Sequence, residues 1–340
     1  MRVLFCGGGT GGHVVPGLAV WEAVRSREPS AEAVFVGTGR EGERRFLAGV
    51  DHVPAYGTGK SHAAAFLAAR RAVRRLRPDV AVGLGGYASV AGVLAAKAAG
   101  VRVVLLEQNA VPGRATTLLA PLAAEVYRGL DYLGRGRTVG TPVRGAIAAL
   151  ADLPPARCAV TRSLLVTGGS QGSRAVNDAV LAALAEVRDE VADFRVVHQT
   201  GDSDRSRVEA AYRLFGITAE VVGHVDMPSA LAAGPVVVGR AGGTTLAELA
   251  CAGVPAVLIP HALSVRDHQI RNALYAGRFG AGVVEEGRSL AGVLASLLRE
   301  PFKRARAATD LRRLARPHAA ADVAHALRQS AGRVAGRAAA

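Results

Sequence analysis

Short apolar runs alternate with longer helical patterns through the first half of the chain. Runs of strand length, rich in β-branched residues, lie at 3–6, 33–36, 80–83 and 101–105, and segments of helical periodicity separate them. Strands that alternate with helices form βαβ units, in which the strands are parallel. We therefore predict an α/β fold with a parallel sheet in a first domain of residues 1–143.

A second series of strands and helices follows an interruption. Residues 144–160 contain Pro154-Pro155 and no strand pattern, which is typical of a linker. After it, a strand, a glycine loop and a helix recur in the order seen at the N-terminus. We expect two Rossmann-like domains, 1–143 and 161–310, that face each other across a cleft. A basic, Ala-rich helical tail at 311–340 is expected to pack back towards the first domain.

The formal net charge of the 340 residues is +14, which would suit nucleic acid or an anionic membrane. Only three of the 42 basic residues are Lys, so we attribute the charge to an Arg- and Ala-rich composition and expect no nucleic-acid partner. No apolar run approaches the ~18 residues of a membrane span, and no signal peptide is recognisable. Three widely spaced cysteines, Cys6, Cys158 and Cys251, indicate reduced thiols in the cytosol.

The first strand runs into a glycine-rich loop at 7–12 and then into a helix. Glycines allow close approach of a ligand, and the N–H groups at a helix start favour an anion. Gly7, Gly9 and Gly12 match the dinucleotide fingerprint G-x-G-x-x-G, but that site also needs an acidic residue at the end of the second strand. That strand ends in Gly37-Thr38, which argues against a nicotinamide cofactor. We place Pro16 in the first turn of the helix.

Polar residues at the other predicted strand ends are candidates for a ligand site, and each has a structural alternative. His13 either acts on a substrate or bonds locally at the helix start. Gly85-Gly86 either approaches a ligand or forms only a tight turn. Asn109 is either a ligand contact or a cap, and Arg144 either binds a ligand or makes an ion pair in the linker.

Two further motifs in the second half also allow two interpretations. Thr245 and Glu248 have the spacing of a capping box, so Glu248 either closes a helix or binds a ligand. Asp202-Ser203-Asp204 resembles the D-x-D of metal-dependent sugar transferases, but its polar surroundings favour a solvated loop. The sequence contains no clear Ser-His-Asp order and no His/Cys cluster with metal spacing.

Seven motifs occur in order along the chain, and as an ordered set they are specific although each alone is not. They are Gly8-Gly9-Thr10-Gly11-Gly12-His13-x-x-Pro16-Gly17, Gly85-Gly86-Tyr87, Glu107-Gln108-Asn109, Pro142-Val143-Arg144, Gly168-Gly169-Ser170-Gln171-Gly172, Arg240-Ala241-Gly242-Gly243-Thr244-Thr245-Leu246-Ala247-Glu248 and Asp267-His268-Gln269-x-x-Asn272-Ala273. From about residue 3 to 285 the chain resembles the MurG family of UDP-N-acetylglucosamine transferases, within glycosyltransferase family 28.

The resemblance implies a GT-B fold and an inverting transfer of N-acetylglucosamine (GlcNAc) without an essential metal or cofactor. The donor would be UDP-GlcNAc, the acceptor O4 of the muramoyl sugar of lipid I, and the product lipid II of peptidoglycan synthesis. Further implied partners are other cell-wall synthesis proteins and the cytoplasmic face of the cell membrane, to which the protein would attach peripherally.

The family pattern also implies site residues, with His13 and Glu248 as the catalytic candidates. His13 would act on the acceptor hydroxyl and Glu248 would hold the ribose diol, while the loop around Ser170 would meet the donor phosphates and Val225 the uracil. The remaining donor contacts would be Thr10, Gly11, Gly12, Asn109, Arg144, Gln171, Gly243, Thr244, Thr245, Leu246, Ala247, His268 and Gln269. The acceptor diphosphate would lie on Gly9, Gly85, Gly86 and Tyr87.

Three features depart from the family pattern and bear on the acceptor side. Thr141 stands where the family usually has Asn, and residues 56–60 match its usual loop only partly. The Arg-rich helix at 61–78 is shorter and less aromatic than the expected membrane contact. Its pairs Arg70/Arg74 and Arg71/Arg75, at i, i+4 spacing, form either that contact or a solvated face.

Three rival functions remain open. A related GT-B enzyme would glycosylate another lipid, such as diacylglycerol, and only an assay with the acceptor separates it from the first interpretation. A nicotinamide-dependent oxidoreductase lacks the second-strand acid that it needs. A non-catalytic nucleotide-binding protein is the third, and the presence of both His13 and Glu248 argues against it.

Overall fold

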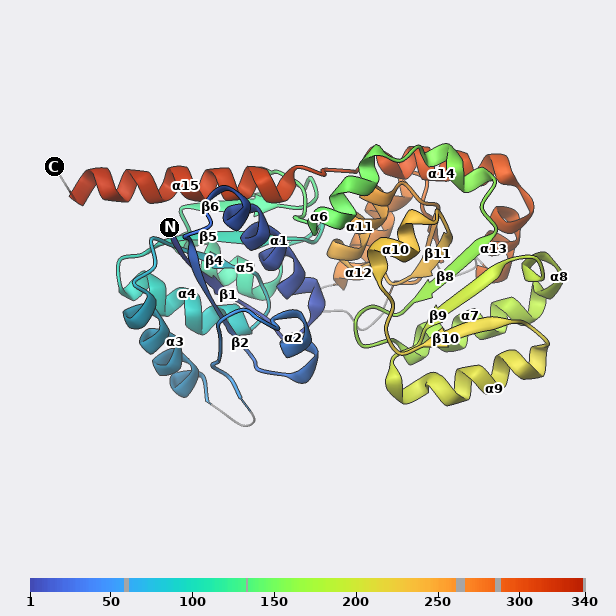
Figure 1. Cartoon of the computed structure of the whole chain (residues 1–340), viewed down its shortest axis with the longest axis horizontal. Helices are drawn as coiled ribbons and strands as arrows, with labels where there is room; N and C mark the ends of the chain where they lie inside the picture. The colour runs from blue at the N-terminus through green and yellow to red at the C-terminus, as the bar shows by residue number, and fades with distance from the viewer. Residues whose placement is uncertain (58–60, 133, 261–266, 285–288, 339–340) are drawn as a thin grey trace. The chain divides into compact units, whose positions relative to one another are not determined.

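The computed structural model describes residues 1–57, 61–132, 134–260, 267–284 and 289–338 (Figure 1). The chain divides into two compact units. Unit 1 comprises Met1–Gly145 together with His318–Ala340, and unit 2 comprises Ala146–Pro317. Each unit has its own parallel sheet and its own hydrophobic core.

The described part of unit 1 contains a seven-stranded parallel sheet in the order β3-β2-β1-β4-β5-β6-β7. Its strands are β1 (Arg2–Cys6), β2 (Glu32–Gly37), β3 (His52–Pro54), β4 (Val80–Gly83), β5 (Arg102–Glu107), β6 (Glu125–Arg128) and β7 (Arg137–Thr138). Its helices are α1 (Gly11–Arg27), α2 (Glu41–Phe46), α3 (His62–Leu76), α4 (Ala88–Ala98), α5 (Arg114–Leu119) and α15 (Ala319–Ala338), with a 3-10 turn at Ala120–Leu122.

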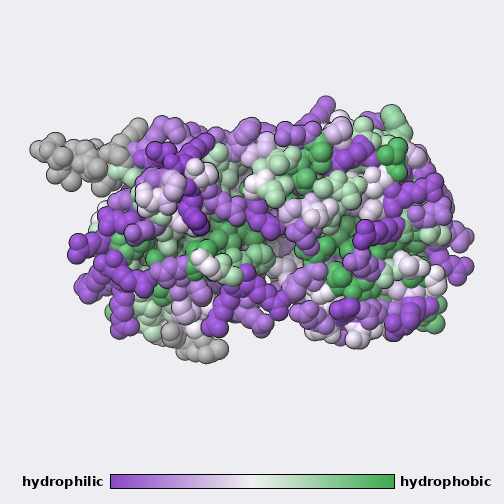
Figure 2. Space-filling view, in the orientation of Figure 1, coloured by the Kyte–Doolittle hydropathy of each residue, from purple (hydrophilic) through white to green (hydrophobic). Residues whose placement is uncertain are grey.

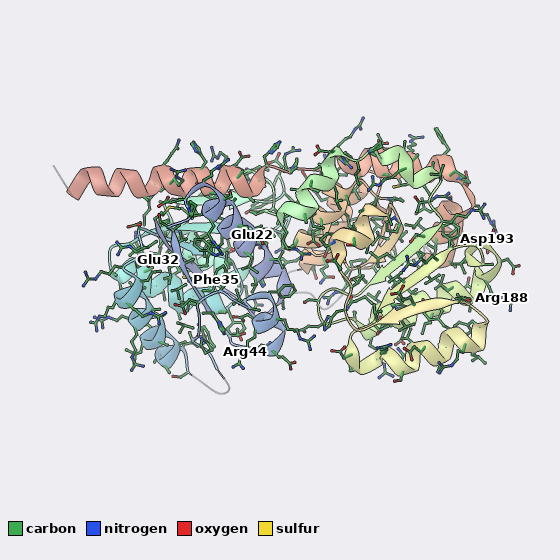
Figure 3. All side chains as sticks on the ribbon, in the orientation of Figure 1. Glu22, Glu32, Phe35, Arg44, Arg188 and Asp193 are labelled. Carbon is green, nitrogen blue, oxygen red and sulfur yellow. The ribbon has the colours of Figure 1, made fainter. Side chains whose placement is uncertain are left out.

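Helices cover both faces of this sheet, as the alternating side chains of β1 require. Leu4 and Cys6 join the core beneath α3 and α4, whereas Val3 and Phe5 join the core beneath α1 and α15. Phe5 stacks on Phe35 of β2, with ring centroids 4.5 Å apart. Figure 3 shows Phe35 within unit 1, in contrast to Arg188 and Asp193, which lie on the surface of unit 2.

The described part of unit 2 contains a six-stranded parallel sheet in the order β10-β9-β8-β11-β12-β13. Its strands are β8 (Ser163–Thr167), β9 (Arg195–Gln199), β10 (Ala219–Val222), β11 (Val236–Gly239), β12 (Ala256–Leu258) and β13 (Gly282–Val283). Its helices are α7 (Arg174–Glu186), α8 (Arg188–Val191), α9 (Arg205–Phe215), α10 (Met227–Ala232), α11 (Gly243–Ala252), α12 (His268–Gly277), α13 (Leu290–Arg299) and α14 (Pro301–Arg312), with a 3-10 turn at Asp202–Asp204.

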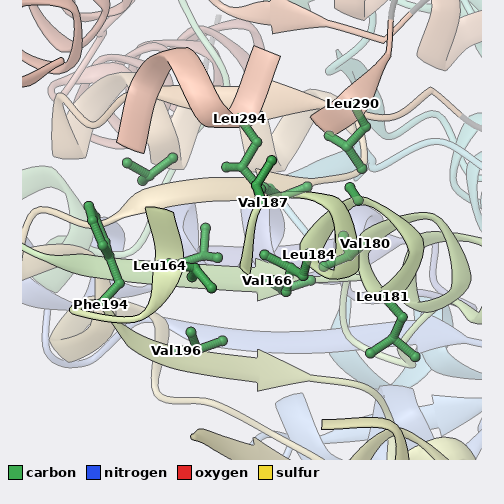
Figure 4. Packing of buried hydrophobic residues seen from close by; sticks show 14 of the residues in the cluster. Leu164, Val166, Val180, Leu181, Leu184, Val187, Phe194, Val196, Leu290 and Leu294 are labelled. Atoms are coloured by element: carbon green, nitrogen blue, oxygen red, sulfur yellow. The ribbon is translucent and has the colours of Figure 1, made fainter. Parts of the chain in front are cut away.

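The core of unit 2 lies between β8 and the helices α7 and α13 (Figure 4). Leu164 and Val166 of β8 face Val180 and Leu184 of α7, and Leu294 of α13 completes the cluster. Each of these five side chains is fully buried. Full burial of a Leu or Val side chain contributes about 1.5–3 kcal/mol relative to exposure, so this cluster stabilises the packing of α7 and α13 on the sheet.

The segment expected to be a linker, 144–160, differs from a free connection, because from residue 146 onwards it packs into unit 2. It forms α6 (Gly145–Ala148) and the turns Ala149–Asp152 and Pro155–Ala159. This segment is held in unit 2 by three buried or half-buried guanidinium groups that donate to backbone carbonyls: Arg157 to Ala252 (2.6 Å), Arg304 to Cys158 (2.9 Å) and Arg312 to Leu153 (3.0 Å). Carbonyl acceptors leave no mark in the residue pattern, so this packing was not predictable from it.

Some of the many arginines therefore have a structural role, because they bind backbone carbonyls inside unit 2. Arg304 is 3 % exposed and further donates to the carbonyls of Leu297 and Leu298, both at 2.9 Å, in the last turn of α13. Cations are favourable at a helix C-terminus, where the last carbonyls lack partners within the helix. Figure 2 shows that hydrophilic residues cover much of the visible face of each unit.

Candidate active site

In each sheet the order of the strands reverses next to the first strand of the unit. In unit 1 the order reverses between β1 and β4, and in unit 2 it reverses between β8 and β11. Ligands of open parallel sheets bind beyond the carboxyl ends of the strands at such switch points. The loops that leave these four strands are residues 7–10, 84–87, 168–173 and 240–242, which carry four of the seven motifs. Within each unit, the topology therefore places two glycine loops next to each other.

The glycine loop after β1 leads into α1, which begins earlier than its sequence indicated. Thr10 is the N-cap, and its carbonyl accepts from the N–H groups of His13 (3.2 Å) and Val14 (3.3 Å). Pro16 consequently lies inside the helix and not in its first turn, as we had placed it. The helix starts at Gly11 because the glycines before it adopt φ angles of 147° (Gly7) and 93° (Gly9), which a helix excludes.

A buried carboxylate lies directly behind this loop, and the sequence motifs did not reveal it. Glu43 of α2 is 1 % exposed. Its Oε2 accepts from the N–H of Gly9 (2.9 Å) and the N–H of Thr38 (3.0 Å), and also from the Thr38 hydroxyl. A Cβ at Gly8 would lie 2.5 Å from the same oxygen, so a larger residue there would displace the Glu43 carboxylate from these bonds. The Gly9 N–H, expected to face the acceptor diphosphate, is directed to Glu43 in this structure.

His13 is brought against the loop that follows β4. Its Nδ1 lies 3.2 Å from Thr10 Oγ1, so the local bond at the helix start is present. Its ring also packs on Gly85 and Gly86, where added Cβ atoms would lie 3.2 Å and 3.3 Å from ring carbons. These two glycines have φ angles of 89° and 70°, so they form a turn that also leaves room for the imidazole. His13 is half-buried and lies at the switch point of unit 1.

The residues after β5 form a loop organised by Glu107. One oxygen of this buried carboxylate accepts from the side chain of Asn109 (2.9 Å), and the other accepts from Gly113 N–H (2.9 Å) and Thr116 Oγ1 (2.6 Å). Gly113 is the N-cap of α5, which excludes the alternative that Asn109 caps this helix. Glu107 therefore positions Asn109 at the carboxyl edge of the sheet.

Three further predicted residues of unit 1 differ in their surroundings. Tyr87 is half exposed, and its ring makes an edge contact with Tyr56 at 5.2 Å between centroids. Arg144 is half-buried and makes no ion pair among the described residues, which removes the linker ion pair as its explanation. Thr141 is 3 % exposed, and its hydroxyl oxygen packs against Gly129. A Cβ added at Gly129 would lie 2.0 Å from that oxygen. Residues 58–60 of the atypical loop lie outside the described part of the chain.

In unit 2 the loop after β8 is closely packed on the segment after β9. Ser170 is half-buried and Gln171 is exposed. Gly172 has a φ angle of 73°, and a Cβ there would lie 2.0 Å from the carbonyl oxygen of Thr200. Only Gly fits this approach. Ser170 lies three residues before Ser173, the N-cap of α7, and the first N–H groups of a helix favour an anion.

The start of the helix after β11 excludes one of the two interpretations of Glu248. Gly242 is the N-cap of α11, so Thr245 is the third helical residue and Glu248 the sixth. A capping box requires its Thr at the N-cap itself, so Thr245 and Glu248 do not form one. Glu248 is 9 % exposed. Gly243, Thr244, Leu246 and Ala247 lie on the same first turns of α11.

Helix α12 is fastened to the loop after β11. Asn272 is fully buried and donates through Nδ2 to the carbonyl of Ala241 (2.9 Å). Arg240 Nε donates to Gln269 Oε1 (3.3 Å), and burial lowers the pKa of this guanidinium. Arg240 was in a predicted motif but not among the predicted site residues. His268 and Gln269 open α12, whereas the preceding residues 261–266 lie outside the described part of the chain.

In the D-x-D sequence, Asp204 is held by hydrogen bonds within unit 2, whereas Asp202 is exposed. Asp204 accepts from Arg207 Nε and Nη2, both at 2.7 Å, and from Asn177 Nδ2 at 2.7 Å. Hydrogen bonds from Arg207 lower the pKa of Asp204 to about 2. Asn177 in turn bonds the buried His198 (3.1 Å), whose pKa burial lowers to about 4. Within the described residues no group of three or more His, Cys, Asp or Glu side chains is placed to hold a metal ion.

Comparison with known proteins identifies relatives over nearly the whole chain. Residues 3–128 match the glycosyltransferase family 28 N-terminal domain, and residues 163–325 match the C-terminal domain of that family. A UDP-N-acetylglucosamine–N-acetylmuramyl-(pentapeptide) pyrophosphoryl-undecaprenol N-acetylglucosamine transferase of Nitratidesulfovibrio vulgaris is 39% identical, over 95% of each chain. The protein of the same name from Sorangium cellulosum is 41% identical, over 95% of this chain and 87% of its own. The crystal structure of Acinetobacter baumannii MurG superposes with a TM-score of 0.76 at 27% identity, over 96% of this chain and 99% of that one.

Proposed function

The chain belongs to glycosyltransferase family 28 and has a GT-B fold, and we propose that it transfers N-acetylglucosamine from UDP-GlcNAc to O4 of the muramoyl sugar of lipid I. The bond between the anomeric carbon and the diphosphate oxygen breaks, and a bond from that carbon to O4 forms with inversion. The products are lipid II and UDP. The observation that carries this proposal is His13 at the switch point of unit 1, seated on Gly85-Gly86, in a chain whose close relatives bear this activity in their names.

We propose that unit 2 holds most of the donor. In this proposal the loop around Ser170 meets the phosphates, the backbone of Val225 meets uracil, and Glu248 holds the ribose diol. Backbone N–H groups at the start of α7 and α11 stabilise the negative charge on the departing diphosphate without a metal ion. Further donor contacts are assigned to Thr10, Gly11, Gly12, Asn109, Arg144, Gln171, Gly243, Thr244, Thr245, Leu246, Ala247, His268 and Gln269.

We propose that unit 1 holds the acceptor and supplies the base. The acceptor hydroxyl must lose a proton as it attacks, and a histidine is the side chain best suited to accept one near neutral pH. If His13 Nδ1–H donates to Thr10 Oγ1, the lone pair of Nε2 receives that proton. The proposed contacts of the acceptor diphosphate are Gly85, Gly86 and Tyr87. Gly9 is a further proposed contact, but its N–H can bind the diphosphate only after its hydrogen bond to Glu43 breaks.

Incubation of the purified protein with labelled UDP-GlcNAc and a short-chain lipid I analogue is expected to yield labelled lipid II. Diacylglycerol in place of lipid I tests the related acceptor, and should give no product. In a parallel thermal-shift measurement, UDP-GlcNAc should raise the melting temperature and NAD should not, because a ligand stabilises only the folded state that it binds. A shift with NAD and none with UDP-GlcNAc, or glycosylation of diacylglycerol alone, would contradict the assignment.

We further propose peripheral attachment of unit 1 to the cytoplasmic face of the cell membrane, where a lipid acceptor would be available. None of the helices in the described residues combines the length and apolar character needed to cross a membrane. Helix α3 exposes Arg70, Arg71 and Arg74 beside Leu67, which is 51 % exposed. Helices α3 and α4 pack together, and α4 exposes Leu94. Basic side chains with apolar neighbours favour an anionic lipid surface.

Changing Arg70, Arg71 and Arg74 to Gln should release the protein from anionic vesicles and leave UDP-GlcNAc binding unchanged. Each basic side chain near an anionic surface contributes about 1 kcal/mol, so three replacements should weaken vesicle binding by roughly a hundredfold. Arg75 is left in place because it already pairs with Asp51 at 2.6 Å. Co-sedimentation with vesicles measures the effect.

The matched control removes three positive charges from exposed residues of unit 2, by changing Arg188, Arg213 and Arg278 to Gln. This variant should bind vesicles as the wild type does. Equal loss in both variants would show that total charge decides binding. Unchanged binding in the α3 variant would show that its arginines form only a solvated face.

A further inference from the structure

Two buried side chains at the carboxyl edge of the unit 2 sheet connect three neighbouring strands. Thr167 and Gln199 are the last residues of β8 and β9, and they pair in register, as Gln199 does with Val222 of β10. They are 4 % and 3 % exposed. The hydroxyl of Thr167 lies 2.9 Å from Gln199 Oε1, and Gln199 Nε2 lies 3.1 Å from the carbonyl oxygen of Gly223.

The direction of each hydrogen bond in this relay is determined. The carbonyl oxygen of Gly223 can only accept, so the NH2 group of Gln199 faces Gly223 and the amide oxygen faces Thr167. The Thr167 hydroxyl therefore donates its single proton to Gln199 Oε1, and it accepts from the N–H of Gly169 (3.2 Å). Three consecutive bonds thus run from Gly169 to Gly223, and each of the two buried side chains both donates and accepts one of them.

The two ends of the relay are the two segments assigned to opposite ends of UDP. Gly169 precedes Ser170, proposed at the donor phosphates, and Gly223 lies two residues before Val225, proposed at uracil. Beside the relay, the backbone of the loop after β8 packs directly on the backbone of the segment after β9. A Cβ at Gly201 would lie 2.4 Å from the carbonyl oxygen of Gln171.

We propose that Thr167 and Gln199 are positioning residues that set the distance between the phosphate loop and the uracil segment. This inference rests on the proposed function and deepens it, since it concerns how the same site recognises UDP. Neither side chain is placed on the ligand. A ligand that reaches both ends gains from correct spacing, because its second contact forms at a high effective concentration. A ligand that reaches only one end gains nothing from that spacing.

The test compares UDP with its two fragments, uridine and inorganic pyrophosphate, by calorimetric titration. Thr167→Val keeps the shape of the side chain and removes the hydroxyl. We expect UDP affinity to fall by roughly tenfold or more, and by a larger factor than the product of the factors for the two fragments. Thr167→Ser, which keeps the hydroxyl, should restore UDP affinity to near the wild-type value.

A matched control lies at the other end of the same strand. Thr161 precedes β8, and its hydroxyl donates to the carbonyl of Arg157 (3.0 Å). Thr161→Val therefore makes the same substitution in the same unit, at a position outside the relay. It should leave UDP affinity unchanged. If circular dichroism shows that Thr167→Val does not fold, Gln199→Met, which removes both bonds of the amide, carries the same expectation.

The outcomes separate the inference from the function on which it rests. If wild-type protein does not bind UDP, the proposed function is wrong and the relay has no role in it. If the wild type binds UDP and the Thr167 or Gln199 variant binds it equally well, only the relay inference is overturned. A UDP loss equal to the product of the fragment losses would also overturn it, because the residues would then act locally and not on spacing.

Discussion

Replacing His13 by Asn is expected to lower kcat by about 10²–10⁴-fold, the usual contribution of a positioned general base. Asn retains a polar side chain that can bond Thr10 but cannot accept the proton of the acceptor hydroxyl. Because unit 2 holds most of the proposed donor site, the dissociation constant for UDP-GlcNAc should stay close to that of the wild type. Steady-state assays with a soluble lipid I analogue and calorimetric titration of the donor measure the two quantities.

Thr10 provides the control for this prediction. Its hydroxyl lies 3.2 Å from His13 Nδ1, and we propose that it selects the tautomer with a basic Nε2. Thr10→Val should lower kcat by a smaller factor than His13→Asn, and Thr10→Ser should retain most of the activity. If His13→Asn turns over at the wild-type rate, His13 is only a residue that bonds locally at the start of α1.

Replacing Glu248 by Gln is expected to weaken donor binding by at least roughly tenfold, with the melting temperature changed by only a few degrees. A ribose diol presents two O–H donors, and a carboxylate can accept both. An amide has one acceptor oxygen and turns its NH2 group towards the second hydroxyl. Loss of a hydrogen bond to a charged group costs about 1.5–3 kcal/mol, which corresponds to about tenfold to over a hundredfold in affinity. Titration with UDP measures it.

Two controls isolate the ribose contact. 2′,3′-Dideoxy-UDP should bind nearly equally to the wild type and to Glu248→Gln, because this ligand lacks the two ribose hydroxyls that Glu248 is proposed to hold. Glu209→Gln removes the same charge from α9 of unit 2, where Glu209 pairs with Arg205 at 2.8 Å, and should bind UDP normally. The capping box is already excluded by the start of α11 at Gly243. Wild-type affinity in Glu248→Gln would therefore remove its proposed role altogether.

The features that the sequence predicted well are those encoded by neighbouring residues. Apolar runs of strand length marked β1, β2, β4 and β5 to within about two residues at each end. Glycine loops next to these strands, and the ordered motifs around them, indicated the family and the candidate residues. These signals are local, since strand periodicity, glycine conformations and motif spacing depend on the chain within a few residues.

Some boundaries were wrong because the deciding interaction is not a residue type. Pro16 was placed in the first turn of α1, although the helix begins at Gly11 through backbone bonds to the carbonyl of Thr10. Residues 144–160 read as a linker, yet Arg157, Arg304 and Arg312 attach them to unit 2 through backbone carbonyls. Every residue has a carbonyl, so the choice of acceptor depends only on which carbonyls lie close together in space.

The sequence by itself determined the strand–loop–helix units, the glycine loops and the identity of the candidate residues. Only the tertiary structure decided which of these loops meet, because strand order follows from packing between distant segments. It placed Glu43 behind Gly9, from 34 residues away, and joined Gly169 to Gly223 through Thr167 and Gln199. Buried donors and acceptors must find partners, and those partners are chosen by proximity after the strands have paired, which no local pattern records.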